Sequence, residues 1–222
     1  MTASSTATQV RLDRSGVTVP VPETMRELAQ QFQRQHHVVF RGFLPPELLA
    51  KVRADIASGK FSDFVSKGVG ADLTLQPSIA VQMLRFMLNQ PSTLAFARAL
   101  SGIESIRGFW GRVYTMLPRP EHFDSWHDDL VDGRQLSITL NLGEVYEGGA
   151  LEMRSRSSKQ VLWAIRNTGP GDAIFFALAP DLQHRVTSVT GAVGKTALAG
   201  WFLDRESDFV SLVHQASAAE PD

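Results

Sequence analysis

Residues 184–203 read HRVTSVTGAVGKTALAGWFL, and this stretch decides the class of fold. Its apolar residues recur with a period of two, which is typical of β-strands rather than helices. We predict one strand from His184 to Val189, a turn at Thr190-Gly191 and a second strand from Lys195 to Leu203. Alternation places Lys195 and Trp201 on one face with only alanines between them. We expect that face to point into the protein and to leave room for a small anion.

The period of two extends back through the second half of the chain. Polar and apolar residues alternate from position 136 to 142, and the polar set, which includes Thr139, is expected to face either the site or solvent. On the preceding long strand, Trp110, Arg112 and Tyr114 share one face. The other predicted strands are Ile106–Met116, Leu136–Leu142, Ala150–Arg154, Val161–Arg166 and Asp172–Leu178.

The first half of the chain has a helical period instead. Apolar stripes between Glu23 and Ser101 predict four helices, the second starting at Pro45-Pro46 and the last ending at Gly102. A short strand, Val38–Phe40, is predicted between the first two.

Together these patterns predict a mainly β (α+β) protein, with helices in its first half. Many short strands at near-regular spacing favour a sandwich or barrel, above all a cupin-like jelly roll, or double-stranded β-helix, braced by helices. We expect a single domain: a disordered tail over residues 1–10, a helical half over 11–104, a jelly-roll core over 105–204 and a C-terminal tail over 205–222.

The composition excludes several classes of function. The chain has 222 residues, a formal net charge of −1 and no cysteine. Nothing in this charge favours nucleic acid, no apolar run is long enough to cross a membrane, and thiolate chemistry is excluded. Residues 1–10 lack the features of a secretory signal, so we expect a cytoplasmic protein.

The candidate metal ligands are His127, Asp129 and His184. In an extended backbone, residues i and i+2 point the same way, so His127 and Asp129 can offer a nitrogen and an oxygen to one ion. A histidine from a distant strand completes one face of an octahedron. Two histidines and one carboxylate with three open positions suit Fe(II).

Other motifs compete with this interpretation. His122 and Asp124 form a second His-x-Asp pair, and the strand that follows favours His127 and Asp129 over it. Gly194-Lys195-Thr196 resembles the end of a phosphate-binding loop, but the required first glycine is absent and a strand follows. We interpret His36, His37 and His214 as surface residues.

The second half of the chain, residues 105–204, resembles the prolyl 4-hydroxylase-like branch of the 2-oxoglutarate/Fe(II) dioxygenases. The resemblance lies in a series of short motifs that follow one another in the same order as in the family. The combination of these motifs is specific to the family. The matching residues are Tyr114, His127, Asp129, Gly148-Gly149-Ala150-Leu151, Gly171-Asp172-Ala173, Phe176, His184, Val186, Val189, Lys195, Trp201 and Phe202.

The resemblance implies Fe(II), 2-oxoglutarate and O₂, with ascorbate as a further reductant, and succinate and CO₂ as co-products. It implies that Lys195 binds the distal carboxylate of 2-oxoglutarate with help from Tyr114. Thr139 and Trp201 are further candidates to contact the co-substrate. Hydroxylation of an unactivated C–H is the expected outcome, since Asp129 stands where halogenases of this superfamily have a small residue that frees a site for halide.

The substrate is expected to be small and amino-acid-like, a natural product or a peptide. Trp126, Arg134, Arg112, Phe123 and the Phe61–Gly70 loop are candidates to line its pocket. Three alternatives stay open: an oxygen-dependent modifier of a protein target, a cupin-type enzyme of other chemistry, and a non-catalytic binding module. We expect no nucleic-acid or membrane partner, and a monomer or homodimer.

Overall fold

The computed structural model describes residues 10–166 and 168–207. The strands in that part of the chain, in chain order, are β1 (Leu12–Asp13), β2 (Gly16–Val17), β3 (His37–Phe40), β4 (Phe61–Ser66), β5 (Gly70–Leu75), β6 (Gly108–Met116), β7 (Phe123–Asp124), β8 (Arg134–Asn141), β9 (Glu147–Gly148), β10 (Leu151–Ser155), β11 (Val161–Ile165), β12 (Ala173–Ala177), β13 (Leu182–Val186), β14 (Val189–Thr190) and β15 (Lys195–Leu203).

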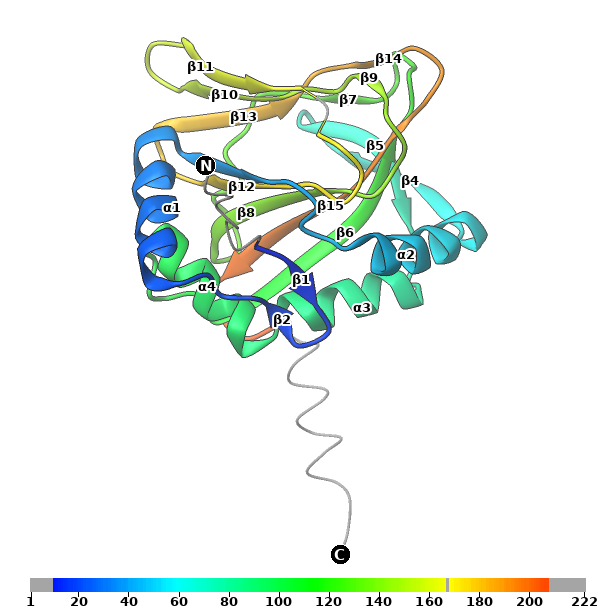
Figure 1. Cartoon of the computed structure of the whole chain (residues 1–222). Helices are drawn as coiled ribbons and strands as arrows, with labels where there is room; N and C mark the ends of the chain where they lie inside the picture. Colours follow the sequence, from blue (N-terminus) through cyan, green and yellow to red (C-terminus); the bar gives the residue numbers. More distant parts are fainter. Residues whose placement is uncertain (1–9, 167, 208–222) are drawn as a thin grey trace, which may run out of the picture.

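These strands form two main sheets that face each other (Figure 1). The larger sheet has the order β3-β12-β8-β15-β6-β5-β4, and the short β7 also pairs with β5. The smaller sheet has the order β11-β10-β13, and β1-β2 and β14-β9 form separate pairs. The pairings between these strands are antiparallel.

The helices belong to the first half of the chain and pack on the face of the larger sheet that points away from the smaller one (Figure 1). Three of them begin with a proline in the first turn, where a missing N–H costs nothing. The last helix is terminated by Gly102, as predicted, and the φ of 74° at this glycine is the left-handed conformation typical of helix C-termini. Their bounds are α1 (Pro22–Gln35), α2 (Pro46–Ser58), α3 (Ile79–Leu88) and α4 (Pro91–Ser101).

The main hydrophobic core lies between these helices and the larger sheet. At its centre Phe175 of β12 is fully buried, with its ring 5.4–5.8 Å from those of Phe40, Phe43 and Phe96. On β15, Leu198 and Phe202 belong to this core, as the alternation predicts. The alternate residues of the same strands, whose side chains point away from this core, therefore face the smaller sheet. The candidate site lies on that face.

The described part of the chain is thus mainly β, a curled antiparallel double-stranded β-helix braced by helices, and the predicted fold class is confirmed. The strand predicted from Lys195 to Leu203 has those bounds in the structure. No helix among the described residues is long and apolar enough to cross a membrane.

Two elements differ from the prediction. The stretch expected to be a loop, residues 61–70, belongs to a hairpin of β4 and β5. Most of β4 is exposed on both faces, so its sequence has no single apolar parity that would reveal a strand. The strand predicted from His184 to Val189 is interrupted, because β13 ends at Val186 and β14 begins at Val189.

The predicted tails fall mostly on residues 1–9 and 208–222, which lie outside the described residues, as does His214. At the edges of those tails, Val10 and Ser207 are buried. The division into a helical half and a catalytic core within one domain stays a prediction.

Asn89 joins the end of α3 to the start of β6. Its buried amide accepts from the Phe109 N–H at 2.8 Å and donates to the Phe109 carbonyl at 3.0 Å. Asn89→Ala would leave both groups buried without a partner, so we expect unfolding free energy to fall by about 1–3 kcal/mol. Urea titration measures this, and Gln90→Ala, on the neighbouring half-exposed residue, should change it by less than about 0.5 kcal/mol. Equal stability of the two variants would contradict the proposed role of Asn89.

Candidate metal centre

The candidate ligands come together where the loop before β8 meets β13. The backbones of His127 and His184 form an isolated antiparallel bridge, with N–H to O distances of 3.0 and 2.8 Å. This bridge brings the two imidazoles side by side, with ring centroids 4.3 Å apart. Asp129 follows two residues after His127, and one ligand atom from each of the three residues lies within 4.8 Å of the others.

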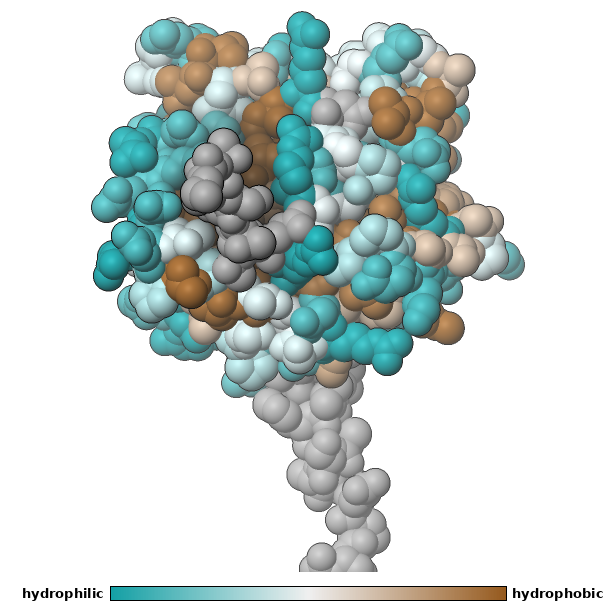
Figure 2. Space-filling model, viewed as in Figure 1, coloured by the Kyte–Doolittle hydropathy of each residue, from teal (hydrophilic) through white to brown (hydrophobic). Residues whose placement is uncertain are grey.

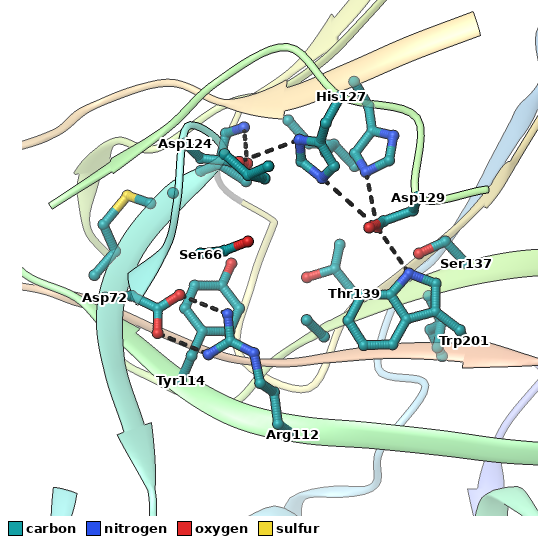
Figure 3. Close-up of a pocket in the computed structure, with 18 of the residues that line it drawn as sticks. Ser66, Asp72, Arg112, Tyr114, Asp124, His127, Asp129, Ser137, Thr139 and Trp201 are labelled. Atoms are coloured by element: carbon teal, nitrogen blue, oxygen red, sulfur yellow. Dashed lines mark hydrogen bonds and ion pairs between the residues drawn. The ribbon is translucent and has the colours of Figure 1, made fainter. Parts of the chain in front are cut away.

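Asp129 reaches this position through a turn rather than an extended strand. Its φ is 58°, in the left-handed region that aspartate tolerates better than most residues. One carboxylate oxygen, Oδ2, lies 3.3 Å from Nε2 of His184 and 3.6 Å from Nε2 of His127 (Figure 3). Among the described residues, these three form the only group of His, Cys, Asp or Glu close enough to hold one ion.

The electrostatics of the three side chains favour a cation between them. Burial lowers the pKa of His127, but the carboxylates of Asp129 and Asp124 outweigh this and raise the pKa to about 9. Burial raises the pKa of Asp129, yet hydrogen bonds and charge from His127 and His184 hold it well below its usual range. The pocket between the three side chains therefore stabilises positive charge, as a metal site must.

The rival His-x-Asp pair takes two separate roles. His122 is buried away from the cluster: its Nδ1 accepts from the Leu117 N–H at 2.8 Å, and its Nε2 lies 2.6 Å from Arg119. Asp124 instead lies beside a candidate ligand, with Oδ1 3.3 Å from Nδ1 of His127.

Asp124 also joins the loop to β13, because its Oδ2 accepts the Val186 N–H at 2.7 Å. Nδ1 of His127 is occupied further by the Ser125 carbonyl at 2.7 Å. These contacts leave Nε2 of His127 to face the cluster, an arrangement common around metal-binding histidines. The sequence spacing could not reveal this role of Asp124.

A cavity of about 220 Å³ opens against the three side chains (Figure 3). The structure brings most of the predicted site residues to its wall, including Phe123 and part of the Phe61–Gly70 segment. The predicted residues that line it are His127, Asp129, His184, Tyr114, Thr139, Trp201, Arg112 and Arg134.

Both arginines of the cavity wall are paired with acids. Arg112 binds Asp72 through both terminal nitrogens, at 2.6 and 2.7 Å, and thereby ties β5 of the hairpin to β6. Its guanidinium also lies 4.2 Å above the Phe64 ring. Arg134 donates to Asp129 at 2.8 Å. The sequence predicted neither of these two pairings.

Lys195 lies outside this cavity and lines a second one of about 10 Å³. Thr139 and Leu151 line both cavities, so the second lies directly behind that part of the wall. The Lys195 ammonium is buried and donates to the Gly149 carbonyl at 3.0 Å. No carboxylate of the described residues forms an ion pair with it, and burial lowers its pKa to about 8.

Trp126 points away from the cavity. The guanidinium groups of Arg154 and Arg185 lie 4.3 and 4.5 Å from the centroid of its ring, and Trp126 is not part of the cavity wall. Residues next to each other on an extended chain face opposite sides, so a ligand at His127 itself directs Trp126 outward. We therefore do not carry Trp126 forward as a substrate contact.

Comparison with known proteins agrees with this geometry. Residues 111–203 match the family model of the 2OG-Fe(II) oxygenase superfamily, where 2OG is 2-oxoglutarate. Curated proteins give no match. Residues 111–203 therefore form a 2OG-Fe(II) oxygenase region, and this family implies the use of Fe(II) and 2-oxoglutarate. Two alternatives, a cupin-type enzyme of other chemistry and a non-catalytic binding module, are thereby set aside.

Solved structures with the same fold include prolyl hydroxylases. A prolyl-4-hydroxylase from Pseudomonas putida is 18% identical, with a TM-score of 0.62 over 82% of this chain and 99% of that one. A prolyl hydroxylase from Trichoplax adhaerens, in complex with a hypoxia inducible factor peptide fragment, is 16% identical, with a TM-score of 0.65 over 86% and 92%. A 2OG-Fe(II) oxygenase family oxidoreductase from Burkholderia pseudomallei is 17% identical, with a TM-score of 0.62 over 82% and 91%.

Proposed function

We propose that this enzyme holds Fe(II) through His127, Asp129 and His184 and hydroxylates an unactivated C–H of its substrate. The observation that carries the proposal is the convergence of two imidazoles and one carboxylate beside a cavity. Nitrogen and oxygen donors on one side of an ion suit Fe(II) and leave the opposite side open to ligands. Bound iron and 2-oxoglutarate supply an oxidant made from O₂, with succinate and CO₂ as co-products.

Lys195 is the proposed partner of the distal carboxylate of 2-oxoglutarate. A buried cation without an anionic partner is costly, so binding a carboxylate there gains more than it would at the surface. The position of Lys195 behind Thr139 and Leu151 places this charge next to the part of the cavity wall that a bound dicarboxylate would contact.

Tyr114 and Thr139 supply hydroxyl groups to the cavity. Burial raises the pKa of Tyr114 well above its usual value, so its hydroxyl stays protonated and can donate to an oxygen of a bound molecule. Thr139 lines both cavities, and its hydroxyl can therefore contact a co-substrate that is bound between them.

The mouth of the cavity favours a substrate with an apolar face. Phe64, Trp110 and Phe123 line the cavity, yet their side chains stay 40%, 39% and 41% exposed. Exposed aromatic rings around a cavity are typical of ligand-binding sites. Since the co-substrate also takes space inside, we infer that the substrate inserts its reacting group and rests the remainder on these rings. An amino-acid-like molecule, a natural product or a peptide, including a segment of a protein target, fits this description.

The metal assignment is tested by the visible absorbance that Fe(II) and 2-oxoglutarate produce together under anaerobic conditions. His127→Ala should lose this absorbance, because one of three ligands to the ion is removed. The matched control is His122→Ala, which removes another buried histidine five residues away and should keep the absorbance. If His122→Ala lost the band and His127→Ala kept it, the metal would belong to the rival pair.

A further inference from the structure

The carboxylate of Asp129 is held by two more side chains than the sequence motif predicts. Trp201 of β15 donates its indole N–H to Oδ2 at 2.8 Å (Figure 3). Arg134 at the start of β8 donates to Oδ1 at 2.8 Å. The two donors come from neighbouring strands of the larger sheet and reach different oxygens of one carboxylate. Together they fix both the position and the rotation of the group.

The two donors also hold each other. The Arg134 guanidinium lies 3.8 Å from the centroid of the Trp201 ring, a cation–π contact. Trp201 in turn stacks on Trp110, with centroids 5.6 Å apart and planes 19° from parallel, and Arg85 lies 5.2 Å from the Trp110 centroid. Arg134 is therefore the inner end of a column of rings and cations, rather than a side chain that moves freely.

The backbone at Asp129 needs such support. Its left-handed conformation is uncommon, and such residues persist where the surroundings hold them. The following residues, Leu130 and Val131, are exposed, so the turn is not buried by its own side chains. The bonds to Arg134 and Trp201 therefore join this turn to the sheet.

We propose that Arg134 and Trp201 are positioning residues that orient Asp129 for the metal. The inference rests on the proposed function, since it requires Asp129 to be a ligand. Arg134 occupies Oδ1. Oδ2 accepts the Trp201 N–H, is the oxygen nearest both histidines, and would face the ion with its second lone pair. Held in this way, Asp129 would offer Oδ2 to the ion together with the two histidines.

Whether metal binding becomes weaker or stronger when Arg134 is removed separates this positioning role from a simple charge effect. Arg134 is a cation close to the site of a doubly charged ion, so Coulomb repulsion alone would make its removal strengthen metal binding. If Arg134 instead orients the ligand, its removal should weaken metal binding. Outer residues that orient metal ligands typically contribute about 10- to 100-fold in metal affinity.

The experiment measures the affinity of the full-length protein for Mn²⁺ alone by calorimetry, without co-substrate or turnover. Arg134→Gln and Trp201→Phe should each bind Mn²⁺ about 10- to 100-fold more weakly. Trp201→Phe keeps an aromatic ring for Arg134 and loses only the N–H donor. Arg134→Lys, which keeps the charge and one donor, should recover part of the affinity. Thermal unfolding of each variant confirms that it is folded.

Arg85→Lys is the matched control, because it changes the cation at the other end of the same column without touching Asp129. Its Mn²⁺ affinity should stay within about twofold of the unchanged protein, as expected for a residue that does not contact Asp129. Unchanged or stronger binding in Arg134→Gln, or weaker binding in Arg85→Lys to the same degree, would overturn the proposal. Asp129→Ala is the further arm: if it kept full Mn²⁺ affinity, the metal assignment itself would fail.

Discussion

Replacing His127, Asp129 or His184 by alanine should each abolish substrate-stimulated succinate formation. The ion has three proposed protein ligands, so removing one leaves two donors and an open position that water fills. The loss should far exceed the effect of any other single substitution considered for this protein. Succinate release is measured with excess Fe(II) and 2-oxoglutarate, so that weaker binding alone cannot explain the result.

The three variants should remain folded, because the core is built elsewhere. The main apolar cluster lies between the helices and the opposite face of the larger sheet, and none of the three ligands belongs to it. Circular dichroism and thermal unfolding check this. Substitution of His122, a buried histidine outside the cluster, should leave most of the turnover intact. Full activity in one of the three alanine variants would remove that residue from the metal site.

Much of the fold follows from sequence period alone. One face of the strand Lys195–Leu203 packs on the core, and the other faces a cavity. Alternate residues of the strand therefore differ in polarity, and this alternation makes the bounds of the strand predictable. The hairpin of β4 and β5 has no such contrast. Most of β4 is exposed on both faces, and its pairing depends on β5 rather than on burial. Periodicity cannot detect a strand of that kind.

The candidate site likewise has a part that the sequence predicts and a part that it does not. Ligand types and spacing predict His127, Asp129 and His184 as candidate ligands, because the chemistry of metal binding restricts which residues can serve. Their supporting contacts depend on backbone conformation that spacing does not encode. The carboxylate of Asp129, whose φ is left-handed, accepts hydrogen bonds from Arg134 and Trp201. The sequence predicts a substrate contact for Arg134, from its proximity along the chain, and a co-substrate contact for Trp201. Proximity along the chain was also a poor guide to Trp126, whose ring faces outward.

The second large effect is expected at Lys195. A charge-assisted hydrogen bond to a carboxylate contributes about 1.5–3 kcal/mol, so Lys195→Ala should raise the KM for 2-oxoglutarate about ten- to a hundred-fold. Metal affinity should change little, because Lys195 lies in the second cavity, away from the ligands. Steady-state kinetics with 2-oxoglutarate as the varied substrate, alongside Mn²⁺ calorimetry, separates the two. An unchanged KM in Lys195→Ala would contradict the assignment.

The pH dependence of that KM gives an independent test. Burial lowers the pKa of Lys195 to about 8, partly offset by Asp124, so the free protein loses this positive charge as pH rises through that value. Only the charged form pairs with a carboxylate. Affinity for 2-oxoglutarate should therefore be full below pH 8 and weaken above it, by up to about tenfold per pH unit. Tyr146, whose ring faces Lys195, has its pKa raised by burial to about 12 and stays neutral in this range.

Lys195→Arg is the control for this dependence. Arginine keeps its charge at every pH tested, so the KM of this variant should stay nearly constant between pH 7 and about 9.5, even if its different shape raises the value overall. Any other group that titrates in this range affects both proteins equally and cancels in the comparison. A rise of KM with pH that is the same in Lys195→Arg as in the unchanged enzyme would place the titrating group elsewhere. A rise confined to the lysine enzyme would identify Lys195 as the cation that binds the co-substrate.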